Sequence, residues 1–117
     1  MVVNMTVFKL PKSKPSESSI ESKGRKYAQS KGHFSYKFVS PSHRSVPDRL
    51  NLAPVPEWLR PVIAKYVCFI EYKKGGKEPT DEQAREHERL RDLGYRVEVI
   101  DNVEDSKKVT DSMGETC

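Results

Sequence analysis

A short and nearly unbroken apolar run at residues 66–72 constrains the fold of this chain more than any other feature. The run is too short to span a membrane, and its β-branched and aromatic residues favour a strand over a helix. A strand that is apolar on both sides has to be covered on both sides. We therefore expect residues 66–72 to form the central strand of the protein.

The remaining segments show periodicities and end signals that alternate between helix and strand. Three prolines exclude a long helix or strand over residues 53–65, where we expect a loop with one helical turn at 56–59. In sequence, the expected helices and strands follow the order αβββαβα, which predicts an α/β fold with a mixed sheet. The other expected elements are a helix from Ser16 or Ser18 to about Ser30, strands at 34–39, 49–52 and 95–100, a helix from Thr80 to about Leu93 with a capping box at Gln83 and a stop at Gly94, and a short helix at 102–113.

Composition indicates one small domain with a thin core. The 117 residues are 35% apolar and 32% charged, so oligomerisation is an expected source of further burial. We place the domain at residues 16–113, with a flexible basic arm at 1–15 and a disordered tail at 114–117. No run can span a bilayer, and the start does not resemble a signal peptide. Cys68 and Cys117 are expected to be a buried thiol and a frayed end in a reducing cytoplasm.

Charge is distributed unevenly along the chain. Residues 1–50 contain ten Lys or Arg and three Asp or Glu, a net charge of +7, whereas residues 51–117 contain eleven and fourteen, a net charge of −3. A basic half beside a more acidic half favours a polyanionic partner held at one face, and nucleic acid is the leading candidate.

Three charged residues stand where a metal-dependent site could form. Asp48 follows Pro47, and Glu71 and Lys73 share one face at the end of the central strand. Two carboxylates can hold a hard cation that polarises a phosphate and acidifies a bound water, while an ammonium offsets the developing charge. A simpler alternative stays open, in which Glu71 and Lys73 mark the point where the strand reaches solvent and Asp48 is a turn residue.

These residues belong to a longer series of motifs. The series is Phe34-x-Tyr36-Lys37-Phe38, Arg44-Ser45-Val46-Pro47-Asp48-Arg49, Phe69-Ile70-Glu71-Tyr72-Lys73, Gly75-Gly76-Lys77, Thr80, Gln83 and Leu90-x-x-Leu93-Gly94-Tyr95-x-Val97. In this order it resembles the virus-type replication-repair nuclease (VRR-NUC) domain, a branch of the PD-(D/E)xK nuclease superfamily. The resemblance spans residues 16 to about 105, and Ser45 stands where the family usually has Gly. It implies a restriction-endonuclease-like αβββαβ core, with a mixed central sheet flanked by helices.

The resemblance also implies a role for each residue of the triplet. Asp48 and Glu71 correspond to ligands of Mg²⁺ or Mn²⁺, with the backbone carbonyl of Tyr72 as a further candidate ligand. Lys73 corresponds to the residue that positions or activates the attacking water and stabilises charge in the transition state.

Two further residues match polar positions of the family. Gln83 looks like the helix Gln that lies over the site, and it can do so while capping its own helix. Glu21 looks like the helix-borne acid that orients a metal-bound water, although a solvated helix Glu explains it nearly as well.

Basic residues and histidines complete the expectations. His33, His43 and His87 lack the spacing of metal ligands, so we expect ordinary surface or helix positions for them. Trp58 is expected near an interface. The residues expected to contact the DNA backbone are Lys12, Lys14, Lys23, Arg25, Lys26, Lys37, His43, Arg44 and Arg49.

The function that the resemblance implies is metal-dependent, structure-specific cleavage of branched DNA, with four-way (Holliday) junctions as the substrate. The resemblance also implies a phage-like homodimer in a bacterial or phage-infected cell. Because its prolines stiffen the loop at 53–65, we expect that two copies can exchange a strand or helix. Two other classes stay open. One is a non-catalytic nucleic-acid-binding module, and the other is an interaction protein whose Glu71 and Lys73 face solvent.

Overall fold

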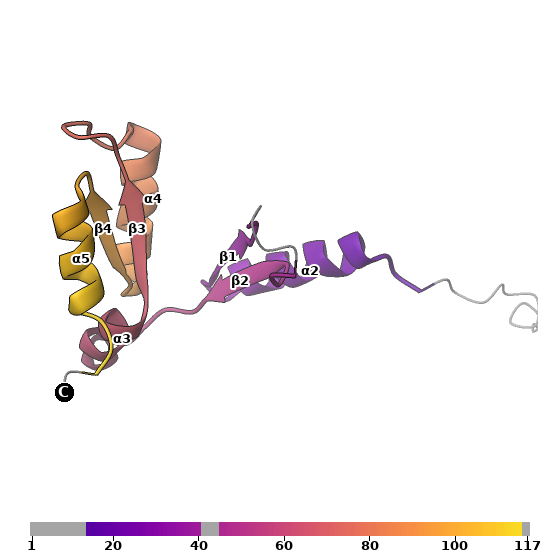
Figure 1. Cartoon of the computed structure of the whole chain (residues 1–117). Coiled ribbons are helices and arrows are strands. Elements are labelled where there is room, and N and C mark those ends of the chain that lie inside the picture. Colours follow the sequence, from indigo (N-terminus) through magenta and orange to yellow (C-terminus); the bar gives the residue numbers. More distant parts are fainter. Residues whose placement is uncertain (1–13, 41–44, 116–117) are drawn as a thin grey trace, which may run out of the picture. The chain divides into compact units, whose positions relative to one another are not determined.

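The computed structural model describes residues 14–40 and 45–115 of the chain, shown in Figure 1. Contacts divide the chain into two compact units, Met1–Leu52 and Ala53–Cys117, which we call the first and the second unit. Each unit is described by itself.

The first unit combines one helix with a pair of strands. Helix α2 (Glu17–Ser30) begins after Ser16, whose side chain accepts a hydrogen bond from the Ser19 N–H at 3.1 Å. Strand β1 (Phe34–Lys37) pairs in antiparallel fashion with β2 (Arg49–Leu52). The predicted cap, helix and two strands are confirmed, although β1 ends two residues earlier than expected.

In the second unit, a parallel strand pair lies between two of the helices (Figure 1). Its elements are η1 (Glu57–Leu59), α3 (Arg60–Tyr66), β3 (Cys68–Tyr72), α4 (Asp81–Leu93), β4 (Arg96–Ile100) and α5 (Val103–Asp111). Cys68 pairs with Arg96, and the register continues to Tyr72 and Ile100. Side chains of β3 alternate between the helices, because Glu71 contacts α4 while the Tyr72 hydroxyl lies 2.7 Å from Ser106 Oγ of α5. The predicted strand is confirmed, and a helix contacts each of its faces. Its faces are less covered than predicted, because none of its residues is buried and Tyr72 is 62% exposed. Its central place in a larger sheet stays a prediction.

The proline-rich segment is more helical than expected. The predicted turn is present as η1, but the chain continues into α3, a seven-residue helix. Pro61 lies in the first turn of α3, where the missing N–H has no partner within the helix in any case. Because α3 extends to Tyr66, strand β3 begins at Cys68, two residues later than predicted.

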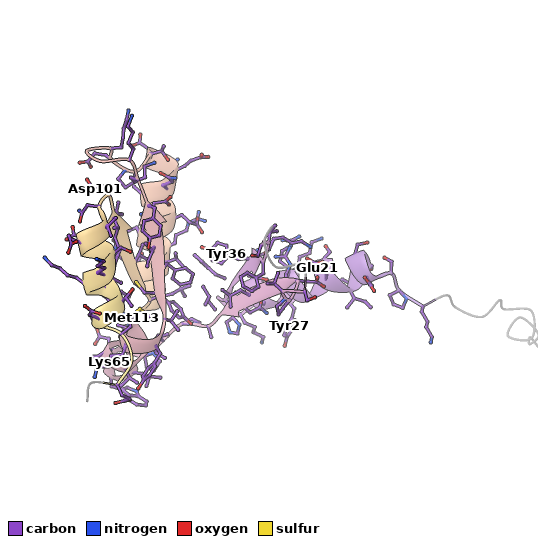
Figure 2. All side chains as sticks on the ribbon, viewed as in Figure 1. Glu21, Tyr27, Tyr36, Lys65, Asp101 and Met113 are labelled. Atoms are coloured by element: carbon purple, nitrogen blue, oxygen red, sulfur yellow. The ribbon has the colours of Figure 1, made fainter. Side chains whose placement is uncertain are left out.

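Two local features fix the ends of α4, and one longer-range hydrogen bond fixes the turn before it. Thr80 and Gln83 form the predicted capping box, and Gly94 ends the helix in the left-handed region at φ 106°. Ahead of α4, the carboxylate of Asp101, labelled in Figure 2, accepts a hydrogen bond from the Gly76 N–H at 3.0 Å. This bond and the Asn102 side chain lower the pKa of Asp101. The glycine turn is thus tied to the end of β4.

The core is as thin as composition predicts. No described side chain is less than 2% exposed, and the buried apolar residues are Ala28, Leu52, Val55, Leu90, Val97, Ile100 and Val109. Cys68 is a free, half-buried thiol whose pKa is raised by burial, and Cys117 lies outside the described residues. None of the described helices is long and apolar enough to cross a membrane.

The α/β class is confirmed by these elements and their order. An antiparallel pair and a parallel pair are the two pairing modes that a mixed sheet combines. That the two pairs join in one sheet stays a prediction, as do the proposed domain boundaries.

Candidate functional site

Glu71 and Lys73, at the end of β3, are held together by one side chain of α4. Gln83 donates from Nε2 to Glu71 Oε2 at 3.2 Å and accepts at Oε1 from Lys73 Nζ at 3.1 Å. The same Oε1 accepts the Thr80 N–H at 3.0 Å, so the helix cap fixes the amide in place. The prediction that Gln83 can both cap its helix and lie over the strand end is borne out by these contacts.

His87 holds the second oxygen of Glu71 from the next turn of α4. Its ring nitrogen Nε2 lies 3.2 Å from Glu71 Oε1, and the residue is only 7% exposed. We expected an ordinary surface or helix position for His87. The residue does lie on a helix, but its side chain is buried rather than at the surface. Gln83 and His87 are four residues apart, a spacing that places both on one face of a helix. That spacing is the sequence signal that could have revealed the contact.

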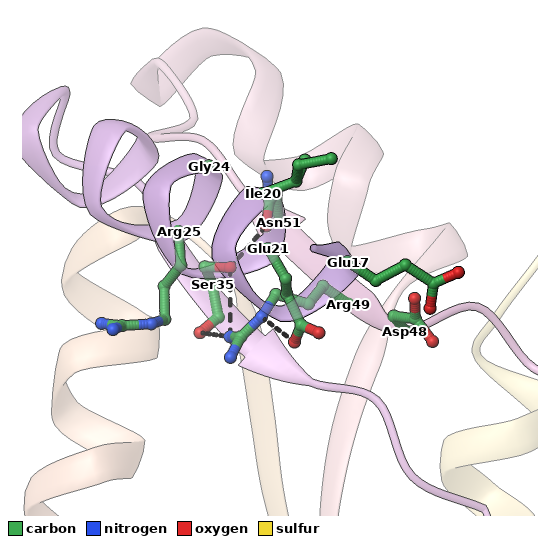
Figure 3. A pocket seen from close by; sticks show the side chains of 9 residues that line it. All are labelled: Glu17, Ile20, Glu21, Gly24, Arg25, Ser35, Asp48, Arg49 and Asn51. Atoms are coloured by element: carbon green, nitrogen blue, oxygen red, sulfur yellow. Dashed lines mark hydrogen bonds and ion pairs between the residues drawn. The ribbon is translucent and has the colours of Figure 1, made fainter. Parts of the chain in front are cut away.

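In the first unit, the carboxylate of Glu21 joins two basic residues of the strand pair. Lys37 Nζ lies 2.9 Å and Arg49 Nε 2.8 Å from Glu21 Oε2. Arg49 also donates to the Ser35 carbonyl oxygen at 3.2 Å, as the dashed lines in Figure 3 show. The hydrogen bonds from Lys37 and then Arg49 lower the pKa of Glu21. Helix α2 is thereby clamped to the strand pair.

Asp48 lies immediately before β2 and lines a pocket of the first unit (Figure 3). The pocket has a volume of about 440 Å³, and the carboxylates of Glu17 and Glu21 line it as well. The Asp48 carbonyl accepts the Phe38 N–H at 2.8 Å, which fixes its backbone to the strand pair. Its side chain is left exposed in this unit.

The chain is 41% identical over 86 residues to a protein of Acyrthosiphon pisum secondary endosymbiont phage 1 named "Putative nuclease p44". The matched residues make up 74% of this chain and 83% of the phage protein. The chain belongs to this phage nuclease family. No family model matches the chain. No solved structure matches it either.

The predicted site residues of this nuclease-family chain therefore fall into two groups. Glu71, Lys73 and Gln83 are brought together in the second unit. Glu21 and Asp48 belong to the first unit and line one pocket there. Their catalytic roles stay predictions.

The predicted DNA-contacting residues are only partly described. Lys12, His43 and Arg44 lie outside the described residues. Lys37 and Arg49 are engaged by Glu21, and Arg25 Nη1 donates to Gln29 Oε1 at 3.2 Å one turn along α2. Lys14, Lys23 and Lys26 are exposed. Their part in DNA binding also stays a prediction.

The Glu21 clamp predicts an acid-sensitive stability of the first unit. The pKa of Glu21 is lower in the folded protein than its usual 4.5. The ionised carboxylate therefore contributes its full stabilisation above pH 4.5, and this contribution is lost as the pH falls through the lowered pKa. We expect Glu21→Gln to melt at a lower temperature than the wild type at pH 7, with the difference vanishing in strong acid. Thermal unfolding followed by circular dichroism measures it. Glu17→Gln is the control, since neither Lys37 nor Arg49 pairs with Glu17; an equal loss in both variants would contradict the clamp.

Proposed function

We propose that this chain is a Mg²⁺- or Mn²⁺-dependent endonuclease of VRR-NUC type that hydrolyses phosphodiester bonds in branched DNA, with four-way junctions as its substrate. The observation that carries the proposal is the set of hydrogen bonds by which Gln83 holds Glu71 and Lys73 at the end of β3. A strand end that merely reaches solvent needs no such arrangement. Membership of the phage nuclease family supports the activity.

The chemistry of the donors fits a hard cation. Glu71 offers carboxylate oxygens, and each oxygen keeps a lone pair after accepting its bond from Gln83 or His87. No group of three His, Cys, Asp or Glu side chains suited to a metal occurs within residues 14–40 and 45–115. From the resemblance, we propose Asp48 as the second carboxylate ligand and the Tyr72 carbonyl as a further oxygen ligand. A bound Mg²⁺ or Mn²⁺ would supply Lewis-acid polarisation of the phosphate and a more acidic water.

Each residue of this chain then has a distinct task. Lys73 presents its ammonium beside Glu71, where it orients the attacking water and offsets negative charge that grows on the phosphate. Gln83 holds the ammonium of Lys73 and the carboxylate of Glu71 next to each other, because its one amide group contacts both. In the proposal, Glu21 orients water from the first unit.

The net charge of +7 in residues 1–50 supports a DNA partner, since Lys and Arg bind phosphate without reading sequence. The proposed backbone contacts are Lys12, Lys14, Arg25, Lys26, Lys37, His43, Arg44 and Arg49.

We also propose a homodimer, because the core is thin and Trp58 is 78% exposed. Two copies related by a two-fold axis would match the symmetry of a four-way junction. Light scattering should give twice the chain mass of 13.4 kDa, and a single-chain mass at assay concentrations would contradict the dimer.

Cleavage of a panel of labelled DNAs tests the proposed substrate. The panel holds a four-way junction, a flap, a linear duplex and a single strand, each incubated with Mg²⁺, with Mn²⁺ or with a chelator. We expect metal-dependent cutting, fastest on the junction. Preference for a flap would overturn the junction assignment alone. Tight binding with no cutting of any DNA would favour the non-catalytic binding module.

A further inference from the structure

His87 is the one buried polar or charged residue among the described residues, at 7% exposure. It lies on α4, whose buried face also carries Leu90. Burying an imidazole without a partner destabilises a fold, so a buried His needs a hydrogen bond. The acceptor here is Glu71 Oε1, 3.2 Å from His87 Nε2. An ionised carboxylate only accepts hydrogen bonds, so Nε2 carries the proton in this contact.

The carboxylate of Glu71 is thus held at both oxygens from one helix. Gln83 donates to Oε2 and His87 lies against Oε1, each at 3.2 Å and from successive turns of α4. One donor would leave the carboxylate free to rotate about its last bond, whereas donors to both oxygens fix its plane. Rotation away from α4 would also leave the buried ring of His87 without its acceptor.

Gln83 cannot fix this orientation alone. Its amide is shared with Thr80 and Lys73, and its Nε2 reaches only Oε2. The contact at Oε1 comes from His87, which is less exposed than Glu71 itself (side-chain exposures of 9% and 29%). The more buried partner therefore constrains the position of the more exposed one.

We propose that His87 is a positioning residue that orients the Glu71 carboxylate for a divalent cation. The inference rests on the proposed function, in which Glu71 is a metal ligand. Side chains that hydrogen-bond to a ligating carboxylate commonly affect metal affinity by about 10- to 100-fold when removed. His87 acts through Glu71 and does not touch substrate.

The test measures Mn²⁺ binding to the full chain without DNA, with free Mn²⁺ followed by electron paramagnetic resonance. We expect His87→Leu to raise the dissociation constant by about tenfold or more, and His87→Gln to stay close to the wild type, because its amide nitrogen can still donate to Oε1. His87→Asn keeps the amide but is too short to reach Oε1, and should resemble His87→Leu. Circular dichroism checks that each variant is folded.

Two further variants separate the possible outcomes. Leu90→Val perturbs the buried face of α4 one turn away and should leave Mn²⁺ affinity unchanged despite lower stability. Unchanged affinity in His87→Leu and His87→Asn, or an equal loss in Leu90→Val, would overturn the positioning role. Glu71→Gln tests the proposed function separately. If it binds Mn²⁺ as the wild type does, the metal assignment fails; if it alone loses binding, only the role of His87 fails.

Discussion

Lys73→Met should slow the cleavage of DNA by about 100- to 1000-fold, because in the proposed function it removes the ammonium that would stabilise charge in the transition state. The fold should persist, since Gln83 Oε1 keeps the Thr80 N–H as a donor when Lys73 Nζ is lost. Single-turnover cleavage at saturating enzyme measures the effect, and a separate titration measures DNA affinity. We expect the cleavage rate to fall by this factor while the dissociation constant for DNA changes little.

Lys74→Met is the matched control for this experiment. It removes the same charge from the next residue, which is exposed and lies outside the hydrogen bonds made by Gln83. If the loss of positive charge acted only by weakening attraction to DNA, cleavage would slow equally in both variants. Similar cleavage rates for Lys73→Met and Lys74→Met would contradict a catalytic role for Lys73.

Gly94→Ala should produce the largest loss of stability, about 2–3 kcal/mol in the free energy of unfolding. Gly94 has φ of 106°, which a side chain disfavours, and an added Cβ would lie 2.6 Å from Arg60 Nε and 2.9 Å from Val55 Cβ. The Arg60 side chain cannot move away freely, because its Nε donates to the Val55 carbonyl at 2.9 Å. Urea unfolding followed by circular dichroism measures the loss.

Gly75→Ala is the control for Gly94→Ala. The nearest atom to an added Cβ at Gly75 is the Asp101 carbonyl oxygen at 3.9 Å, an ordinary contact. Its effect should stay within about 0.5 kcal/mol. Equal destabilisation by the two substitutions would show that the close approach at Gly94 does not limit stability.

Features with local causes were predictable from the sequence. The capping box at Thr80 and the stop at Gly94 depend on neighbouring backbone, so the bounds of α4 follow from residue types. The extent of α3 does not follow from treating all three prolines of the segment as helix breakers. Pro61 breaks a helix only in its interior, and here it lies in the first turn.

Site residues were predictable where their spacing along one strand or helix sets their position. They were less predictable where contacts between elements set it. Glu71 and Lys73 share a face because a strand alternates, and Gln83 was placed near them through the family resemblance. The burial of His87 depends on how α4 packs against β3, which composition does not reveal. The ion pairs of Glu21 likewise join α2 to residues 16 and 28 positions away in the sequence.

The most direct test of the proposed metal-dependent nuclease activity is the metal dependence of junction cleavage by the wild type and by Asp48→Asn. Both proteins are stripped with a chelator and assayed under single-turnover conditions as Mn²⁺ is added back. We predict no cutting without metal, saturable cutting by the wild type, and at least a 100-fold lower rate for folded Asp48→Asn at saturating metal. Cutting by the wild type in chelator, or by Asp48→Asn at the wild-type rate, would contradict the account.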